Sequence, residues 1–563
     1  MASENLITDH LDLWSAAVRP KSSAGRGSNS KLELTGIKKL RELILELAVR
    51  GKLVPQDPCD EPASVLLERI AAEKGRLVKE GKIKKPKALP EISEEEKPFE
   101  LPEGWVITRL GEIGIWATGN GFPINEQGLE DLEILFCKVS DMNLDGNERF
   151  ILKTMNTVSE DTARRIKLNL HKAGTVIFPK IGGAIATNKR RIITKATAID
   201  NNCLGITPYS EVASDYLFLL LTSIDMSKYQ VGTSVPALSQ GTLELIPIGI
   251  PSIDEQHRIV AKVDELMVLC DQLELRSESQ LTAHQTLVEA LLATLIDSTD
   301  ADELAQNWAR LSTHFDTLFT TDASIDALKQ TILQLAVMGK LVPQDPSDEP
   351  ASALLERIAA EEAQMVKEKK ITKEKPLPAI SEDEKICNLP EGWVKCRLND
   401  IIKISSGDGL TSKQMANDGS IPVFGGNGIT GYHDQFNVSQ PTIVIGRVGF
   451  YCGSVHITPS KAWVTDNAFV TSFSHVNIHL DFLAWLLKAT NLNEHDNATA
   501  QPVISGRKLY PIVVCLPPLA EQHRIVAKID ELMDLCDQLK FRLQTSQQTQ
   551  LALAESLVEG ALA

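Results

Sequence analysis

The sequence predicts an α+β protein in which two compact α+β domains are joined by long antiparallel coiled-coil helices, arranged as a circularly permuted duplication with a pseudo-two-fold axis. Three observations support this prediction. Several segments occur twice. One repeated segment begins a run with the heptad spacing of a long helix. The segments between the repeats have the short apolar runs and turn residues typical of strands.

Two of the repeats share one offset. GKLVPQDP begins at Gly51 and again at Gly339, 288 positions later (339 − 51). LPEGWV begins at Leu101 and again at Leu389, with the same offset, so no net insertion separates the two motifs. The segments that follow LPEGWV do not match each other. One duplicated frame therefore holds two unlike inserts, and we expect it to present two different binding surfaces.

A third repeat starts the long helix. EQHRIVAK begins at Glu255 and returns at Glu521, an offset of 266 (521 − 255). Apolar residues recur after it at alternating spacings of four and three, which is the seam of a coiled coil. The long helix is predicted over residues 253–297 and again from residue 519 to the end of the chain.

The two copies of the long helix are predicted to differ by a stutter. Cys270 and Val288 are 18 residues apart, whereas Cys536 and Val558 are 22 apart. A difference of four residues is one that a coiled coil absorbs by local unwinding.

Shorter elements complete the frame in two copies. The long helix precedes the short one in mid-chain, whereas at the ends the short helix opens the chain and the long one closes it, which is the order of a circular permutation. The Lys/Pro/Glu-rich tethers are too polar for a core and are expected to be extended. The predicted pairs are short helices at 37–50 and 325–338, amphipathic helices at 61–80 and 349–368, and tethers at 83–99 and 371–387.

The pattern divides the chain into seven parts. These are a flexible N-terminal arm (1–30), a helical region with its tether (31–105), a first α+β domain (106–251), a central helical region (252–342), an amphipathic helix with its tether (343–393), a second α+β domain (394–516) and a final long helix (517–563).

Composition and charge restrict the classes of function. The 563 residues are 43% hydrophobic and contain no run of about 18 apolar residues, so no membrane span is expected. The nine cysteines form no CxxC pair, and the N-terminus is not a signal peptide, which indicates a cytoplasmic protein with reduced thiols. The net charge of −17 lies in the frame, because the two inserts are nearly neutral (−1 for 106–250 and +1 for 394–516). The inserts are therefore free to approach a polyanion, and the acidic frame is expected to face basic partners.

Motifs for catalysis are absent from the sequence. GNGITG at Gly426 matches a dinucleotide fingerprint in form, but YHDQFNVSQP follows it and does not open a helix. No Gly-Lys pair is followed by Ser or Thr, and no Asn/Asp-Pro-Pro-Tyr/Phe motif of amino-methyltransferases occurs. We expect a non-catalytic chain with no cofactor or metal of its own.

Basic and amide residues at predicted turns of the inserts are candidates for contact with DNA. Arginine and lysine read guanine or hold phosphate, and asparagine reads adenine. The candidates are Lys138, Ser140, Lys180, Lys189, Arg190 and Arg191 in the first insert, and Lys413, Asn427, Thr430, Arg447, Asn467, Arg507 and Lys508 in the second.

The chain resembles the specificity subunit of type I restriction-modification systems over roughly residues 31–563. The resemblance rests on the paired LPEGWV entries and the paired EQHRIVAK-[VI]-DELM helix starts. It also rests on segments similar to the family's target-recognition domains. These are PVFGGNGITGYHDQF at Pro422, TIVIGRVGFYCG at Thr442 and WVTDNA at Trp463, and more weakly TGNGFP at Thr118, GTVIFPKIGGA at Gly174 and SVPALSQGTLELIPIGIP at Ser234.

The resemblance implies a specific set of partners. Each target-recognition domain would read one part of a split, asymmetric site in double-stranded DNA, and the helices would set the unread spacer. The helices would also dock two modification subunits, which bind S-adenosylmethionine and methylate adenine. Restriction subunits would add translocation and cleavage driven by ATP, with Mg²⁺. All of these cofactors belong to the partner subunits and none to this chain.

Two other classes of function fit the sequence less well. A fused methyltransferase is disfavoured because both its cofactor loop and its catalytic motif are missing. A coiled-coil adaptor that binds two proteins and no DNA is disfavoured by the basic, loop-rich inserts, and a salt-dependent shift of a labelled duplex would distinguish it.

Overall fold

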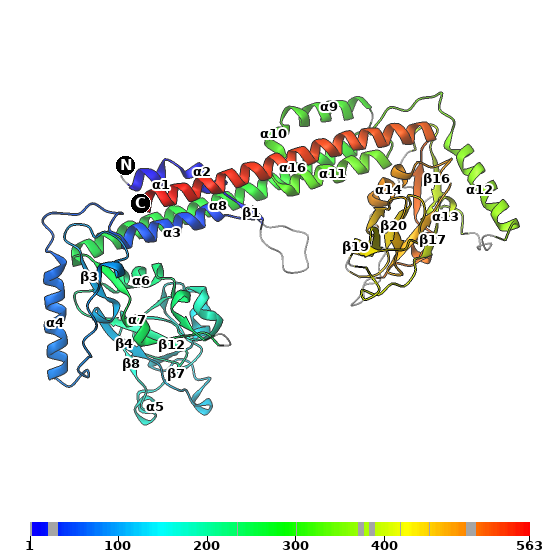
Figure 1. The fold of residues 1–563 in the computed structure, drawn as a ribbon. Helices are drawn as coiled ribbons and strands as arrows, with labels where there is room; N and C mark the ends of the chain where they lie inside the picture. The colour runs from blue at the N-terminus through cyan, green and yellow to red at the C-terminus, as the bar shows by residue number, and fades with distance from the viewer. Residues whose placement is uncertain are drawn as a thin grey trace. The chain divides into compact units, whose positions relative to one another are not determined.

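The computed structural model describes residues 3–20, 32–232, 235–299, 301–369, 377–381, 389–416, 418–449, 451–490, 492 and 503–562. The chain divides into two compact units, unit 1 (residues 1–279 with 546–563) and unit 2 (residues 280–545). Helix α8 (Ile253–Asp297) passes from unit 1 into unit 2, and helix α16 (Leu519–Leu562) passes from unit 2 into unit 1 (Figure 1). The predicted α+β class and both long helices are confirmed.

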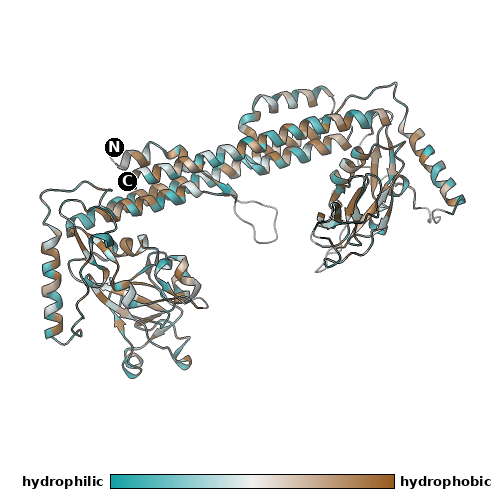
Figure 2. Ribbon diagram, viewed as in Figure 1, coloured by the Kyte–Doolittle hydropathy of each residue, from teal (hydrophilic) through white to brown (hydrophobic). Residues whose placement is uncertain are grey.

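In unit 1 the short helix α3 (Thr35–Val49) packs against both long helices. Arg41 pairs with Asp271 of α8 at 2.6 Å, and Lys39 pairs with Glu555 of α16 at 3.1 Å. Gln56, beyond the end of α3, bonds Glu255 at the start of α8, so α3 runs antiparallel to α8. Leu40, Leu43, Ile44 and Leu47 of α3 are buried, as expected for its apolar face. Figure 2 shows hydrophobic and hydrophilic residues interspersed along both long helices.

In unit 2 helix α11 (Asp322–Val337) takes the same role. Lys329 pairs with Asp537 at 2.5 Å and Asp326 pairs with Lys540 at 3.0 Å, so α11 runs antiparallel to the first part of α16. Both predicted short helices are therefore confirmed, each starting two or three residues earlier than expected.

The two long helices have the same register throughout, and the predicted stutter is wrong. Lys52 Nζ donates to the carbonyl oxygen of Leu562 at 3.1 Å, and its counterpart Lys340 donates to that of Ile296 at 2.6 Å. Ile296 and Leu562 are thus equivalent, with the 266-residue offset of EQHRIVAK.

The counterpart of Val288 is therefore Ala554 and not Val558. Val288 is 2% exposed and Ala554 is fully buried. The predicted stutter paired Val288 with Val558 because it compared large apolar residues only. The small core residue Ala554 was therefore not considered.

The N-terminal region is helical rather than a flexible arm. Helix α1 (Ser3–Thr8) is followed by α2 (Leu11–Ala16), which packs on α3, and the side chain of Trp14 in α2 is fully buried. Unit 2 has a counterpart in α9 (Ala301–Thr313) and α10 (Phe315–Leu318). His10 precedes α2 and His314 precedes α10 with nearly the same backbone angles. The rest of the predicted arm, residues 1–2 and 21–30, lies outside the described residues.

The head of unit 1, residues 106–250, contains two main sheets. One is five-stranded with the order β4-β12-β9-β10-β6, and the other is four-stranded with the order β7-β5-β11-β8. Their strands are β4 (Gly114–Thr118), β5 (Ile134–Cys137), β6 (Phe150–Ile151), β7 (Thr157–Val158), β8 (Leu170–His171), β9 (Val176–Pro179), β10 (Arg191–Ile193), β11 (Thr197–Ile199) and β12 (Cys203–Pro208).

The head of unit 2, residues 394–516, repeats this arrangement with fewer strands among its described residues. Its sheets have the orders β17-β23-β20-β21 and β19-β18-β22. Their strands are β17 (Lys403–Ser406), β18 (Ile421–Gly425), β19 (Gly428–His433), β20 (Ile443–Gly446), β21 (Val455–Ile457), β22 (Trp463–Val464) and β23 (Ala468–Ser472).

Each head begins and ends on one antiparallel strand pair, which joins it to the frame. In unit 1 β3 (Val106–Arg109) pairs with β15 (Pro247–Ile250), and in unit 2 β16 (Val394–Arg397) pairs with β24 (Val513–Leu516). A helix of each head also lies against the short frame helix: α6 (Ser214–Ser223) against α3, and α14 (Leu480–Ala489) against α11.

The amphipathic helices form as predicted, at α4 (Ala63–Lys79) and α12 (Ala351–Lys367), but the tethers are not free. Buried Arg109 donates to the carbonyl oxygen of Pro90 at 3.2 Å and pairs with Glu96 at 2.9 Å. Its counterpart Arg397 donates to the carbonyl oxygen of Pro378 at 3.1 Å. The remaining second tether, apart from 377–381, lies outside the described residues.

Candidate nucleic-acid interface

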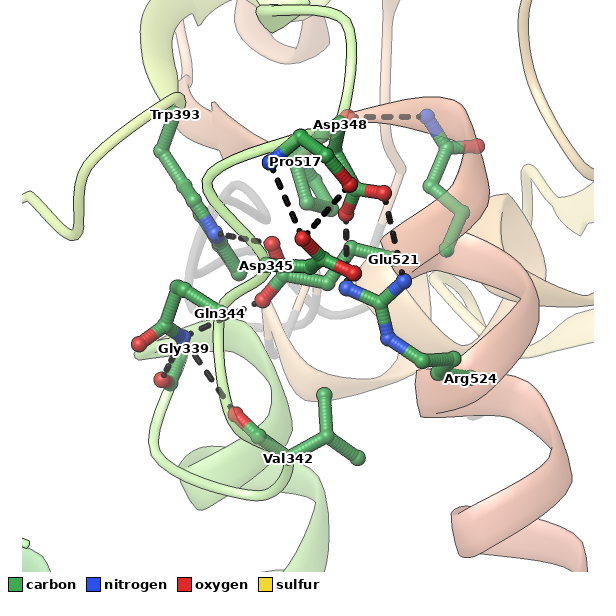
Figure 3. Close-up of polar contacts among 11 residues, drawn as sticks. Gly339, Val342, Gln344, Asp345, Asp348, Trp393, Pro517, Glu521 and Arg524 are labelled. Atoms are coloured by element: carbon green, nitrogen blue, oxygen red, sulfur yellow. Dashed lines mark hydrogen bonds and ion pairs between the residues drawn. The ribbon is translucent and has the colours of Figure 1, made fainter.

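A cluster of hydrogen bonds unites the three repeated motifs where each head meets the frame. In unit 2 the indole Nε1 of Trp393 donates to Glu521 Oε2 at 3.0 Å, and Gln344 Nε2 donates to Glu521 Oε1 at 3.1 Å (Figure 3). Arg524 pairs with Asp348 at 2.6 Å one helical turn further on. Gly339 has φ +70°, and a Cβ there would lie 2.4 Å from Pro390, so only glycine fits.

Unit 1 has the same cluster residue for residue. Glu255 accepts from Trp105 at 3.0 Å and from Gln56 at 3.1 Å, and Arg258 pairs with Asp60 at 2.6 Å. Burial raises the pKa of Glu255 and of Glu521, although the hydrogen bonds oppose this shift. The cluster fixes the entry of each head to the start of a long helix. Its groups are committed to one another, so its role is structural.

The loops at the ends of the central strands form a common backbone arrangement in the two heads, which we call the loop platform. In head 1 the backbone N–H of Lys180 donates to the carbonyl oxygen of Asn202 at 2.8 Å, and Leu238 N–H donates to that of Lys180 at 2.8 Å. In head 2 Arg447 N–H donates to Asn467 at 2.9 Å, and Ile504 N–H donates to Arg447 at 3.0 Å.

Three further backbone hydrogen bonds correspond in the same way. In head 1 the backbone N–H groups of Asn120, Asp200 and Cys203 donate to the carbonyl oxygens of Ile199, Cys137 and Asp200, respectively. In head 2 the corresponding N–H groups of Asp408, Thr465 and Ala468 donate to the carbonyl oxygens of Val464, Phe424 and Thr465. The heads therefore share one platform although their sequences do not match, because these contacts involve backbone atoms only.

The candidates of head 1 gather beside this platform and around the turn η4 (Val139–Asn143). Lys180 is half-buried at the end of β9, and Ser140 is exposed on η4. Lys138, just before η4, donates to Gln127 at 2.7 Å and lies over the ring of Phe122. Lys189 Nζ bonds Asn143 Oδ1, and so ties the start of β10 to η4.

Arg190 is a correction to the predicted contact set. Its side chain is 2% exposed, lies over the ring of Phe178 and donates to the carbonyl oxygen of Leu221 at 3.0 Å. Burial lowers the pKa of Arg190 to about 10, so the guanidinium remains charged at neutral pH. This side chain faces the interior and is not available to a duplex.

The neighbouring Arg191 also supports the fold. Its guanidinium donates to the carbonyl oxygens of Arg190 and Met142, each at 2.7 Å, and it is only partly exposed. The basic run Lys189–Arg191 thus braces the η4 turn, and it presents fewer free charges than its sequence indicates.

The candidates of head 2 lie in two groups. Arg447, Asn467 and Asn427 gather on the loop platform, and a Cβ on Gly426 would lie 3.5 Å from the carbonyl oxygen of Asn467. Arg507 and Lys508 lie in α15 (Gly506–Leu509), which follows the platform residue Ile504 closely. Thr430 and Lys413 lie at the hairpin of β18 and β19. Thr430 Oγ1 donates to the carbonyl oxygen of Val423 at 3.3 Å. The turn that contains Lys413 leads to Ala416, whose backbone N–H donates to the carbonyl oxygen of Tyr432.

The residues around Arg447 show why it is only half-exposed. Its guanidinium lies 5.4 Å from the ring centroid of Phe469 and donates to Ser406 Oγ at 3.3 Å. GNGITG forms the turn between β18 and β19 and the first part of β19. It is therefore not a strand–helix junction, as expected. Sequence reasoning missed Asn202, whose only signal was that DNN at 200–202 and TDN at 465–467 both end in asparagine.

Comparisons with known proteins agree with this arrangement. A model of the type I restriction modification DNA specificity domain matches residues 102–283 and 390–546, so both heads are covered together with the first part of a long helix. The chain belongs to the specificity subunits of type I restriction-modification systems. As a specificity subunit it is the DNA-recognising, non-catalytic component.

Two specificity subunits match this chain along the whole length of both proteins. The EcoAI specificity subunit of Escherichia coli is 42% identical and the EcoEI specificity subunit of the same organism is 43% identical, each over 100% of both chains. A solved HsdS subunit from Thermoanaerobacter tengcongensis aligns with 83% of this chain and 98% of its own, at 19% identity and a TM-score of 0.40. Among the described residues of this specificity subunit, no helix is long and apolar enough to span a membrane, and no group of side chains is arranged to hold a metal ion.

Proposed function

We propose that each head reads one part of a split site in double-stranded DNA through its loop platform. The observation that carries the proposal is the pair of equivalent bonds, Lys180 N–H to Asn202 O and Arg447 N–H to Asn467 O. Each places one cation and one exposed amide together at the end of a buried strand. Cations bind phosphate or guanine, and amides read base edges in the major groove.

The proposed contacts of head 1 are Lys138, Ser140, Lys180 and Lys189, with Asn202 added and Arg190 withdrawn. Arg191 acts through the η4 turn. The proposed contacts of head 2 are Lys413, Asn427, Thr430, Arg447, Asn467, Arg507 and Lys508. The unlike side chains of the two platforms support recognition of two different half-sites, which makes the whole site asymmetric.

The test is methylome mapping of cells that carry the chain with its partner subunits, using Lys180→Ala and Arg447→Ala as separate variants. Each variant should weaken binding in one half-site and leave the other half-site unchanged. Equal effects of both variants on both halves would contradict the assignment of one half to each head.

We also propose that the frame docks two modification subunits. Leu275 and Phe541 are equivalent, with the 266-residue offset, and are 70% and 71% exposed. Two copies of one partner require two equivalent surfaces, and large exposed apolar side chains are typical interface anchors. Charged residues lie near both positions: Asp271 and Glu274, which pair with Arg41, in unit 1, and Asp534, Asp537 and Arg542 in unit 2.

Stoichiometry tests the docking proposal. Leu275→Glu or Phe541→Glu alone should leave one modification subunit bound per chain, and the double variant should leave none, as measured by mass photometry. Val476→Glu, at an apolar residue of head 2 that is 77% exposed, is the matched control and should still bind two. Two bound subunits on the double variant would contradict the proposal.

The remaining roles follow from the same proposal. S-adenosylmethionine, ATP and Mg²⁺ are used by the modification and restriction subunits, and the assembly acts in the cytoplasm. Helices α8 and α16 set the unread spacer between the half-sites. A coiled-coil adaptor without DNA recognition is not favoured, because both heads match the DNA specificity domain.

A further inference from the structure

We infer that Asn202 and Asn467 read the same base, an adenine, at corresponding positions of the two half-sites. This inference rests on the proposed function and names a base for each platform. Both residues are exposed, and both precede the first residue of a buried central strand, Cys203 of β12 and Ala468 of β23. A side chain next to a rigid strand is held more precisely than one in mid-loop.

Asn202 and Asn467 are equivalent platform residues that have the same side chain. The flanking positions of the platform differ: Asn120 has the counterpart Asp408, and Asp200 has the counterpart Thr465. Position 180 is lysine and its counterpart 447 is arginine, so a cation is common but its geometry is not. A base common to both half-sites is therefore assigned to the amide, and the bases that distinguish them to the differing side chains.

Asparagine chemistry selects adenine. An asparagine amide forms two hydrogen bonds with adenine in the major groove, accepting from N6–H through Oδ1 and donating to N7 through Nδ2. In head 1 Asn202 Nδ2 donates one hydrogen to Asp200 Oδ2 at 3.1 Å, and the backbone N–H of Asn202 donates to Asp200 Oδ1 at 3.0 Å. The amide nitrogen has a second hydrogen for N7, and Oδ1 is the acceptor for N6–H. Asp200 thus orients the amide, and both hydrogen bonds of the amide to adenine remain possible.

The test uses the full chain assembled with its modification subunits and synthetic duplexes that contain its mapped site. Each adenine is replaced in turn by 7-deazaadenine, which keeps N6 but lacks the N7 acceptor. With the wild-type complex, one position in each half-site should lose affinity. With Asn202→Ala the sensitivity to 7-deazaadenine should disappear in one half-site only, and with Asn467→Ala in the other only. Loss of the complete two-bond contact should reduce discrimination against a wrong base roughly 5- to 150-fold.

Two further variants sharpen the result. Asn201→Ala changes an exposed asparagine next to Asn202 and should leave both sensitivities intact. Asn202→Asp offers only acceptors and loses the donor that bonds Asp200, so it should weaken binding and shift the preference at that position from adenine toward cytosine, whose N4 is a donor. This variant also serves if Asn202→Ala is poorly folded.

The outcomes separate the inference from the function on which it rests. A wild-type complex that recognises no split site would refute the proposed function. A wild-type complex that does so, but whose sensitivity to 7-deazaadenine is unchanged in the folded variants, would overturn the inference alone. A uniform loss of affinity for all sequences would also overturn it, because that result indicates a phosphate contact.

Discussion

The indole Nε1 of Trp393 donates a hydrogen bond to Oε2 of Glu521 at 3.0 Å, and this bond joins the first strand of head 2 to the first turn of α16. Trp105 and Glu255 form the same bond at 3.0 Å in unit 1. The partners come from two motifs that lie far apart in the chain, LPEGWV and EQHRIVAK. The bond explains why these motifs occur together in both copies.

The Trp393–Glu521 bond should contribute measurably to stability. Trp393→Phe leaves a buried carboxylate oxygen with one donor fewer, which should lower the free energy of unfolding by about 1–3 kcal/mol in denaturant titration. Trp116→Phe is the control, because Trp116 Nε1 is buried with no hydrogen-bond partner among the described residues. Equal losses from the two substitutions would show that packing, and not the bond, accounts for the effect.

Arg190 and Lys180 should have opposite phenotypes. Arg190→Ala removes buried bonds from a charged donor and should destabilise the protein by about 2–3 kcal/mol. Lys180→Ala should leave stability unchanged, weaken DNA binding and lower the salt slope by about 0.9 if the lysine binds phosphate. Thermal unfolding and a salt titration of duplex binding measure the two effects. A stable Arg190→Ala variant with a reduced salt slope would reverse these roles.

The contact between Arg109 and Glu96 should make the first tether sensitive to acid. Arg109, together with the backbone of Ser93, lowers the pKa of Glu96 from 4.5 to about 2. A lowered pKa adds stability that is present above about pH 4.5 and is lost as the pH falls toward 2. The difference in Tm between wild type and Glu96→Gln should therefore be constant from pH 7 to pH 5.5 and shrink below pH 4.5. A difference that does not change with pH would rule out this ion pair as its cause.

The purified chain should neither methylate nor cut DNA by itself. The sequence lacks the cofactor, nucleotide and amino-methyltransferase motifs. Incubation with labelled S-adenosylmethionine and duplex should transfer label only after modification subunits are added. Transfer by the chain alone, above the background of a buffer control, would refute this prediction.

The frame was largely predictable from the sequence because its contacts involve side chains that are conserved between its two copies. Trp393, Glu521 and Gln344 each have an identical counterpart, so an exact repeat indicated a shared structure. The heptad seam also located both long helices. The register of their second half was missed because Ala554 occupies a core position without being a large apolar residue.

The loop platform was less predictable, because backbone hydrogen bonds leave little signal in a sequence. The equivalence of Lys180 with Arg447 becomes visible only through the bonds to Asn202 and Asn467. Burial is also hard to infer for a basic residue at a predicted turn. Arg190 stands between Lys189 and Arg191, and only the structure shows that its side chain points inward onto Phe178.

The central claim is that two heads read two half-sites while the long helices set the distance between them. Helix α8 passes between the units at residues 279–280 and α16 at residues 545–546, which are equivalent positions with the 266-residue offset. Four residues inserted after Gln280 and four after Ser546 should lengthen each helix by about 6 Å, at 1.5 Å per residue.

Methylome mapping of cells that carry this doubly inserted variant with its partners tests the claim most directly. The account predicts unchanged half-site sequences and a spacer altered by about one or two base pairs, since base-pair steps are roughly 3.4 Å. Insertion at Gln280 alone is the control and should impair assembly, because it puts the two helices out of register. An active double variant with altered half-site bases and an unaltered spacer would contradict the account.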